Sequence, residues 1–359
     1  MSSAAFGSTS GAVSEAVARA EAQLASFWST PEGAAGGGAA KVRASTLNYV
    51  IVCAPQDAEA YREAAEKLSE THGGRTLLLT MSGRMAAWDL VPEIHAVCRI
   101  DAGTPICYDR VDLTFGAVAA SRAESVVRTL ALPELPTVVE IGAGAPTPLV
   151  DALAGKFDRL IVDSAKTSPT TLARILQHTS CRVADRAMIR TYAWRELTAR
   201  FFDDAHGALG EVRRVEIERT PMSQAQAGGT QDPAALIFGW LASRLGWTFS
   251  SKGAARDAEG EAIELAVADD ERAGLGPGQL TAVRIRCALG GQSLDCSLER
   301  TSTAAAVRWK MRGARNADRE HALGHKDETW VAVKAIDSTE GDAVTRAALL
   351  SAAQWEAAK

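Results

Sequence analysis

Continuous apolar runs of strand length recur through the first half of the chain, with amphipathic stretches between them. The runs are LNYVIVCA, RTLLLT, TVVEIG and RLIVDS, at 47–54, 75–80, 137–142 and 159–164. Such runs are typical of strands covered on both faces. Helices are predicted between and around them at 57–72, 118–130, 148–154, 170–178 and 191–203, and a pair of strands at 93–101 and 105–115. This alternation predicts an α/β fold, a three-layer Rossmann-like domain with a largely parallel sheet.

The second half alternates apolar and polar positions instead, which predicts strands covered on one face. Those strands are expected at 211–219, 261–269, 280–288, 292–299 and 304–311, with a hairpin turn at Gly290-Gly291. Asp232-Pro233 opens a helix that ends at Gly246, and Gly239 beside its apolar stripe would let another backbone approach closely. A last helix is predicted at 342–356. We therefore expect an α+β C-terminal domain rich in antiparallel strands.

The N-terminal region has its own pattern. Residues 11–28 carry a thin apolar stripe of Val13, Val17, Leu24 and Trp28, and the glycine-rich run EGAAGGGAA follows at 32–40 as a flexible linker. The helix either docks on its own domain, which we favour, or reaches a partner. The expected organisation is a helix and linker at 1–40, an α/β domain at 41–205 and an α+β domain with a C-terminal helix at 206–359.

Composition narrows the function classes. The chain has 359 residues and a formal net charge of -5, and this negative charge argues against nonspecific electrostatic binding to nucleic acid. No apolar run reaches the roughly 20 residues that span a bilayer, and the N-terminus does not resemble a secretory signal. The six cysteines show no CxxC pair, so we expect free thiols and a cytoplasmic protein. Cys287 and Cys296 flank the Gly290-Gly291 turn but are not directly opposite in a two-residue hairpin.

The loop VVEIGAGAP at 138–146 is the main candidate for a ligand site. Gly142 and Gly144 match the first two glycines of a Rossmann-like phosphate or S-adenosylmethionine loop, and Asp163 follows about twenty residues later at a strand end. Pro146 stands where the third glycine belongs, and a proline supplies no N–H donor. We favour a structural strand-to-helix turn. The alternative is an enzyme that binds a nucleotide-like ligand, such as an S-adenosylmethionine-dependent methyltransferase.

Other candidate sites are weaker. Asp163 and Ser164 could bind a ligand or partner, but capping of the next helix is favoured. The sequence contains no GxSxG elbow and no GxxxxGK[ST] loop, and its six histidines form no HExxH motif. We therefore expect no catalytic residues, no metal site and no cofactor.

Three sequence segments, in this order along the chain, resemble segments of a known protein family. They are FDRLIVDSA at 157–165, ADRAMIRTYAWRELTARFFD at 184–203 and ALIFGWLASRLGW at 235–247. Together they are similar to the OpcA family, the assembly or allosteric-effector subunit of glucose-6-phosphate dehydrogenase. HGGRTLLLT at 72–80 and LALPELPTV at 130–138 resemble further family segments. The segment VVEIGAG at 138–144 stands where family members commonly carry a tryptophan pair and a glycine. A divergent family member that binds a different partner protein is therefore an open alternative.

The resemblance implies a non-catalytic cytoplasmic protein whose partner is glucose-6-phosphate dehydrogenase. Such a protein would raise flux into the oxidative pentose phosphate pathway by promoting the active oligomer. Its protein-protein contacts could use Trp194, Arg195, Trp240 and Arg244, because tryptophan and arginine are frequent interface anchors. Helical periodicity nevertheless favours the core for both tryptophans. Candidate surfaces thus comprise these residues with Gly142, Gly144, Asp163 and Ser164.

Overall fold

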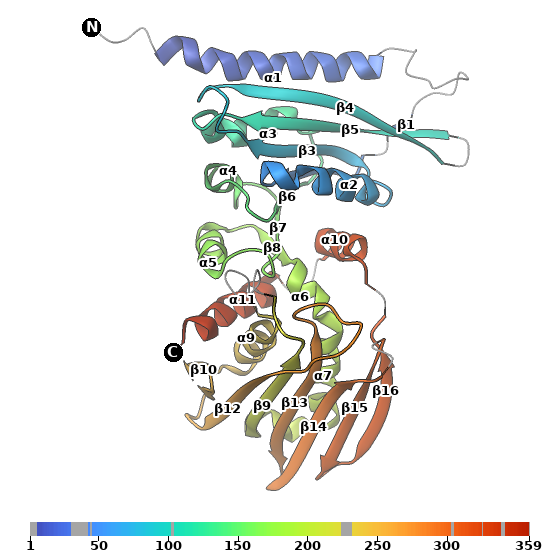
Figure 1. Ribbon diagram of the computed structural model, residues 1–359, viewed down its shortest axis with the longest axis vertical. Coiled ribbons are helices and arrows are strands. Elements are labelled where there is room, and N and C mark those ends of the chain that lie inside the picture. Colours follow the sequence, from blue (N-terminus) through green and yellow to red (C-terminus); the bar gives the residue numbers. More distant parts are fainter. Residues whose placement is uncertain are drawn as a thin grey trace. The chain divides into compact units, whose positions relative to one another are not determined.

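The computed structural model describes residues 6–29, 42–43, 45–101, 104–223, 232–302, 305–324, 326–338 and 342–358 (Figure 1). The chain forms two compact units. Unit 1 comprises Met1–Asp163, Gln177–Ala184 and Ala332–Asp337, and unit 2 comprises Ser164–Leu176, Asp185–Val331 and Ser338–Lys359. The glycine-rich segment at 32–40 lies outside the described residues, and the division into 1–40, 41–205 and 206–359 stays a prediction.

Sheet A is the largely parallel sheet that the sequence predicted. Its strands run in the order β5-β3-β2-β6-β7-β8, with parallel pairing from β5 through β7, and the short β1 (Val42–Arg43) also pairs with β5 in parallel. Their bounds are β2 (Leu47–Val52), β3 (Gly74–Met81), β5 (Thr104–Phe115), β6 (Thr137–Ile141), β7 (Arg159–Val162) and β8 (Arg182–Asp185). Counted along the chain from β2, this order is 3-2-1-4-5-6, which is the Rossmann arrangement. The antiparallel β4 (Leu90–Asp101) pairs with β5.

Helices cover sheet A because its strands are apolar on both faces. They include α2 (Ala58–Leu68), α3 (Ala123–Leu130) and α4 (Thr147–Leu153), and every residue of β2 is buried. The N-terminal helix α1 (Phe6–Ser29) packs against β4 and α3, with Val13, Val17 and Leu24 buried. Trp28 at its end donates a 2.7 Å hydrogen bond to Asp109 of β5. The favoured interpretation, that this helix docks on its own domain, is confirmed.

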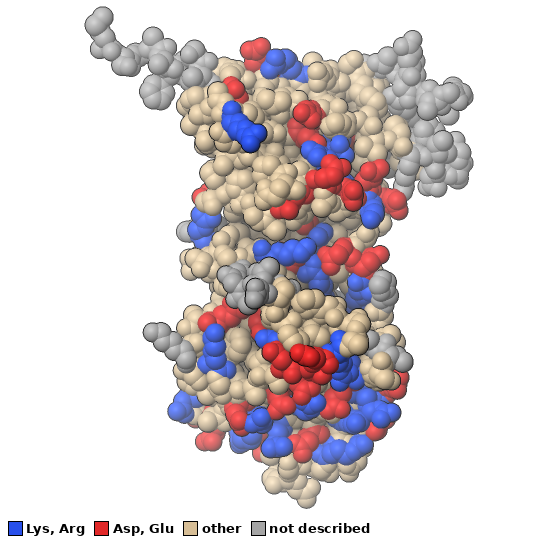
Figure 2. Space-filling model, viewed as in Figure 1, with Lys and Arg blue, Asp and Glu red and all other residues tan. Residues whose placement is uncertain are grey.

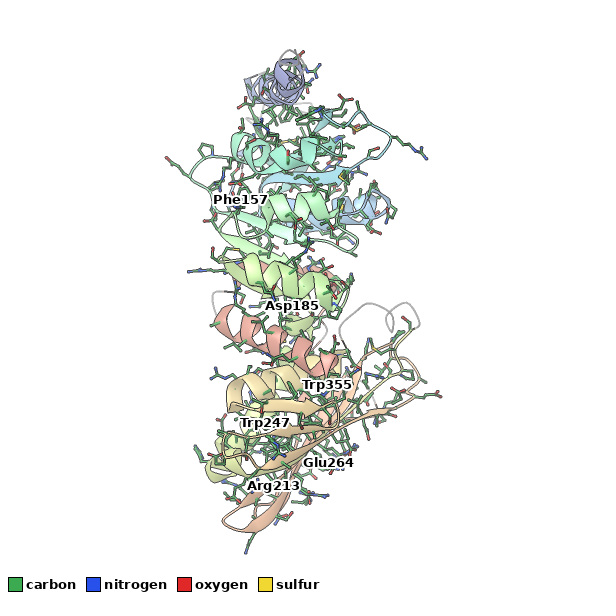
Figure 3. The ribbon with its side chains drawn as sticks, turned by 90° about the vertical axis from the view of Figure 1, so that its left-hand side faces the viewer. Phe157, Asp185, Arg213, Trp247, Glu264 and Trp355 are labelled. Carbon is green, nitrogen blue, oxygen red and sulfur yellow. A yellow bond between two sulfur atoms is a disulfide. The ribbon has the colours of Figure 1, made fainter. Side chains whose placement is uncertain are left out.

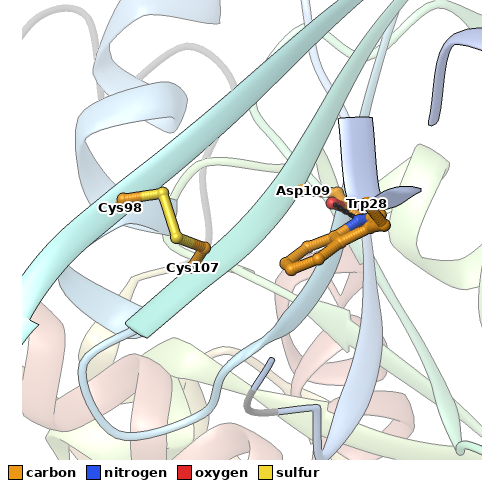
Figure 4. The surroundings of a disulfide bond; sticks show 4 residues. All are labelled: Trp28, Cys98, Cys107 and Asp109. Carbon is orange, nitrogen blue, oxygen red and sulfur yellow. Dashed lines mark hydrogen bonds between the residues drawn. A yellow bond between two sulfur atoms is a disulfide. The ribbon is translucent and has the colours of Figure 1, made fainter. Parts of the chain in front are cut away.

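A disulfide corrects the expectation of free thiols for two of the six cysteines. Cys98 of β4 and Cys107 of β5 stand directly opposite each other, and their sulfurs lie 2.10 Å apart (Figure 4). CxxC spacing gives no sign of this pair, because the antiparallel pairing of β4 with β5 brings together residues nine positions apart. Cys53, Cys287 and Cys296 are free thiols, and the register confirms that Cys287 and Cys296 are not directly opposite.

Sheet B is an eight-stranded sheet in the order β10-β11-β12-β9-β13-β14-β15-β16. Its strands are β9 (Val212–Arg219), β10 (Thr248–Ser251), β11 (Ala254–Arg256), β12 (Ala262–Asp269), β13 (Leu280–Leu289), β14 (Gln292–Arg300), β15 (Ala306–Gly313) and β16 (Ala317–Ala322). All pairings are antiparallel except that of β12 with β9. The α+β prediction is therefore confirmed.

One face of sheet B packs on helices. The ring of Phe201, from α7 (Tyr192–Asp204), stacks on Trp309 of β15 at 4.7 Å between centroids. The helix α9 (Pro233–Leu245) packs against α11 (Asp342–Ala357). A Cβ on Gly239 would lie 2.4 Å from the carbonyl oxygen of Ala348, so the close backbone approach predicted at this glycine is confirmed. The remaining helices include α5 (Pro169–His178), α6 (Arg186–Arg190) and α10 (Glu328–Asp337).

Candidate functional site

The Gly142–Gly144 loop lies at the topological switch point of sheet A, between the carboxyl ends of β2 and β6. Rossmann enzymes bind their cofactor at this position. The amide of Gly142 donates to the carbonyl of Val52 at 2.8 Å, which ties the two strand ends together. Gly144 has a φ of 61°, in the left-handed region that favours glycine. The predicted strand-to-helix turn is therefore present, and α4 follows it.

Tyr61 of α2 occupies the space above this loop. A Cβ on Gly142 would lie 2.5 Å from the Tyr61 hydroxyl, so the absence of a side chain here admits the tyrosine ring. The same hydroxyl accepts a 3.1 Å hydrogen bond from the amide of Ala143. That amide is the kind of donor which a phosphate or ribose would use in a nucleotide-binding loop. The space beside Gly142 is therefore taken by the side chain of Tyr61 and not left open for a ligand.

The segment after β2 also departs from a phosphate-binding loop. It reads Cys53-Ala54-Pro55-Gln56-Asp57 and contains no glycine. Pro55 lacks an amide donor, and Asp57 places a carboxylate before α2, where a bound phosphate would be repelled. Burial raises the pKa of the Cys53 thiol to about 12, which leaves it protonated and unreactive near neutral pH. The switch point therefore has the Rossmann topology, but the described segment after β2 lacks the glycine turn of a pyrophosphate-binding loop and has a proline in place of one amide donor.

A second group in unit 1 has the residue types of a metal site. Glu93, His95 and Asp112 offer ligand atoms within 4.8 Å of one another. Asp112, however, already accepts hydrogen bonds from Arg62 at 2.8 Å and Arg110 at 3.1 Å. Two guanidinium groups neutralise this carboxylate and oppose a bound cation. The group is therefore best described as an ion-pair cluster on β4 and β5.

In unit 2, Asp185 links two of the quoted phrases, FDRLIVDSA and ADRAMIRTYAWRELTARFFD. Asp185 ends β8 and caps α6 by accepting from the amide of Met188 at 2.9 Å (Figure 3). It also accepts from the amide and hydroxyl of Ser164, at 2.7 and 2.8 Å. Ser164 is fully buried, so its hydroxyl belongs to this internal network. Sequence reasoning singled out Ser164 and missed Asp185, although an aspartate directly before a helical segment is a capping signal.

Arg195 reaches the same network from α7. Its guanidinium donates to the carbonyl of Met188 at 2.9 Å and to the hydroxyl of Thr191 at 3.3 Å. Burial lowers the pKa of Arg195 to about 10, against the attraction of the nearby Asp185. The structure therefore brings Arg195 and Ser164 to one cluster around Asp185 and Met188.

The other predicted site residues are dispersed. Trp194 is 4% exposed, and the guanidinium of Arg300 lies over its ring at 5.6 Å. Trp240 is half-buried and Arg244 is exposed, both on α9. Asp163 is buried and is the last residue of the first chain segment of unit 1. The core position favoured for both tryptophans thus holds fully for Trp194 and only in part for Trp240.

A basic cluster lies beside the Asp185 network. Arg190 of α6 binds both carboxylate oxygens of Glu328, from Nε at 2.9 Å and from Nη2 at 2.6 Å. Arg186 lies 4.0 Å from the same carboxylate. The hydrogen bond from Arg190, together with the charges of Arg190, Lys166 and Arg186, lowers the pKa of Glu328. Lys326 lies over the rings of Tyr192 and Trp330, at 5.2 and 4.6 Å.

The face of sheet B that carries charged side chains holds a shallow cavity of about 280 Å³. Figure 2 shows acidic and basic residues interspersed over the part of the surface where Figure 1 places this sheet. Arg284, which lines this cavity, forms ion pairs with Glu216, Glu218 and Glu299. Arginine and carboxylate side chains on adjacent strands therefore pair within the face, as is usual for a solvated sheet.

These features define a class: a two-unit α/β protein with Rossmann strand order, in which Tyr61 packs against Gly142 at the switch point. Comparison with known proteins gives the particular family. Residues 65–180 match the model of the glucose-6-phosphate dehydrogenase subunit N-terminal domain, and residues 181–349 match that of its C-terminal domain. The chain belongs to this family, OpcA, so the expected membership is confirmed.

Curated relatives agree with the family models. The OxPP cycle protein OpcA of Synechocystis sp. is 30% identical over 168 residues, which cover 44% of this chain and 34% of the relative. Its counterpart from Nostoc punctiforme is 32% identical over 167 residues, which cover 43% of this chain and 34% of the relative. The matched region thus spans about a third of the length of each relative.

Solved structures of similar topology are more distant. An oxidoreductase from Sinorhizobium meliloti is 14% identical, with a TM-score of 0.45 and coverage of 88% of this chain and 91% of that one. The 3-ketoreductase KijD10 from Actinomadura kijaniata is 12% identical, with a TM-score of 0.40 and coverage of 88% and 97%. Structural similarity at this level says nothing about ligand or activity.

The part of the chain that the structure describes contains no helix with both the length and the hydrophobicity of a membrane span.

Proposed function

We propose that this chain is a non-catalytic subunit that binds glucose-6-phosphate dehydrogenase and favours its active assembly, in the cytoplasm and in the oxidative pentose phosphate pathway. The observation that carries the proposal is the match of both family domains, which together extend from residue 65 to residue 349. The names of the relatives from Synechocystis sp. and Nostoc punctiforme agree with the same pathway.

The geometry of the switch point supports a non-catalytic role. Tyr61 packs against Gly142 and accepts the amide of Ala143, and the segment after β2 offers a proline and an aspartate where a cofactor needs donors. The thiol of Cys53, the first residue after β2, is held protonated by burial. A Rossmann-like unit whose Ala143 amide is already engaged and whose segment after β2 contains a proline suits a scaffold better than an enzyme.

The physical route would be selective binding. A subunit that binds the active assembly of the dehydrogenase more tightly than its inactive form shifts the population toward the active form. A tenfold difference in affinity corresponds to about 1.4 kcal/mol. Of the candidate contact residues, Gly144 and Arg244 are exposed and Trp240 is half-buried, so these are the accessible members of the proposed surface.

The experiment combines this chain with the dehydrogenase of the same organism. We expect a rise in kcat or a fall in KM for glucose 6-phosphate, together with a heavier complex by light scattering. Arg244→Glu on α9 should weaken this effect, and Arg200→Glu, an exposed arginine on α7, serves as the matched control. Unchanged kinetics and unchanged oligomer mass at micromolar concentrations of both proteins would contradict the proposal.

A further inference from the structure

Three cationic side chains of unit 2 act on one carboxylate, that of Glu328. Arg190 binds it with two parallel hydrogen bonds, at 2.9 and 2.6 Å. Arg186 approaches to 4.0 Å, and the charge of Lys166 also acts on this group. The two-pronged contact of Arg190 is the geometry in which arginine recognises either a carboxylate or a phosphate. The chain therefore contains an oxyanion site occupied by its own side chain.

The cationic side of this site is held more firmly than the anionic side. The side chain of Arg186 is 9% exposed and that of Arg190 is 28% exposed, whereas that of Glu328 is 60% exposed. Both arginines lie on α6, whose first turn is fixed by Asp185. Glu328 begins α10 and faces solvent, so its side chain can leave the arginines at small cost.

Two acidic groups close to the basic cluster in the sequence have hydrogen-bond partners of their own. Asp185 is engaged by the amides of Ser164 and Met188 and by the Ser164 hydroxyl. Asp327 caps α10, since its carboxylate accepts from the amide of Trp330 at 2.7 Å. Lys326, beside the rings of Tyr192 and Trp330, adds a further positive charge on the same segment as Glu328.

We propose that Arg190 and Arg186 form a binding site for a phosphate monoester, and that Glu328 occupies this site until the phosphate displaces it. A phosphate group carries a charge of about −1.5 to −2 near neutral pH, so it interacts more strongly with the two arginines than a carboxylate does. The proposal goes beyond association with the dehydrogenase, because binding requires this chain alone.

The test is isothermal titration calorimetry of the full chain at constant ionic strength, with inorganic phosphate and with glycerol 3-phosphate. Glu328→Gln keeps the shape of the side chain and removes the competing charge, so it should tighten phosphate binding roughly tenfold. Arg190→Gln should weaken binding by a similar factor. Tighter binding of the ester than of inorganic phosphate would identify an organic ligand, and equal affinity would identify phosphate itself.

Matched controls come from the ion pair of Arg200 and Glu196 on α7, which has the same residue types at 2.7 Å. Glu196→Gln should leave phosphate binding unchanged. Arg190→Lys keeps the charge and loses the planar fork, so it should also weaken binding even if Arg190→Gln fails to fold. Equal phosphate affinity in the wild type, Glu328→Gln and Arg190→Lys would overturn the proposal, as would the absence of saturable binding to Glu328→Gln. Arg190 and Glu328 would then form an ordinary surface ion pair.

Discussion

Glu356 shows how one residue can make the stability of unit 2 depend on pH. This half-buried carboxylate of α11 accepts a 3.1 Å hydrogen bond from the amide of Asp232, the residue that caps α9. Burial raises the pKa of Glu356, and the charge of Asp232 raises it further. The amide hydrogen bond and Lys252 act in the opposite direction but do not prevail. The ionised form is therefore disfavoured in the folded protein.

We predict that Glu356→Gln stabilises the protein near neutral pH. An acid with a raised folded pKa binds its proton more tightly in the folded state, so its contribution to stability falls as pH rises from the unfolded pKa through the folded one. Glutamine keeps an oxygen acceptor for the Asp232 amide and carries no charge. The difference in the free energy of unfolding should be largest near pH 7 and should shrink below pH 4.

The measurement is urea denaturation of both proteins between pH 3.5 and pH 8. Glu63→Gln, an exposed change on α2, is the control and should lack the trend expected for Glu356→Gln. A Glu356→Gln variant that loses stability at pH 7 would contradict the prediction.

At the scale of elements, the pair of α9 and α11 depends on a helix position without a side chain. The Cβ of an alanine at position 239 would lie 2.4 Å from the Ala348 oxygen and 2.5 Å from the Ala352 nitrogen. These are backbone atoms of α11, so the whole helix would have to move. We predict that Gly239→Ala lowers the free energy of unfolding by about 1–3 kcal/mol.

The control is Gly11→Ala in α1, a helical glycine where an added Cβ would meet no atom within 4 Å outside its own helical turns. Alanine has the higher helix propensity, so this change should stabilise the protein by up to about 1 kcal/mol. Opposite signs for the two substitutions, measured by urea denaturation, would demonstrate the close contact of α9 and α11. If both substitutions raise the free energy of unfolding, α11 can move away from position 239 without loss of stability.

Most of these elements could be predicted from the sequence, because apolar runs and alternation report burial directly. The strands β2, β3, β6 and β7 and the helix α9 begin and end close to the predicted positions. The short β8, β10 and β11 and the polar β16 were missed, since none carries enough periodic positions to indicate a strand. The helix α10 was missed as well.

The candidate sites were less predictable, because they depend on residues far apart in the chain. Ser164 and Arg195 were selected from local motifs, and Asp185, which joins them, was not. The contact of Arg190 with Glu328 joins residues 138 positions apart, and no local pattern indicates it. Tyr61 lies 82 positions from Ala143, so no local pattern indicates its contact with the glycine loop.

For the whole molecule, the main functional question is whether its Rossmann-like unit binds a nucleotide. The strand order favours such a ligand at the carboxyl ends of β2 and β6. The side chains there oppose it, because Tyr61 takes the amide of Ala143, and Pro55 and Asp57 follow β2. Topology provides the location of a cofactor site, while the hydrogen-bond donors decide whether a cofactor binds.

We predict that the full chain shows no saturable binding of NADP or S-adenosylmethionine at the switch point, by calorimetry up to millimolar ligand. Heat from NADP that disappears in Arg190→Gln would come from its phosphate groups at the Glu328 site. Heat that persists in Arg190→Gln and disappears in Gly144→Trp would come from the switch point. Micromolar binding of that second kind would show that Tyr61 moves aside, and the chain would then have to be considered as an enzyme or a nucleotide sensor.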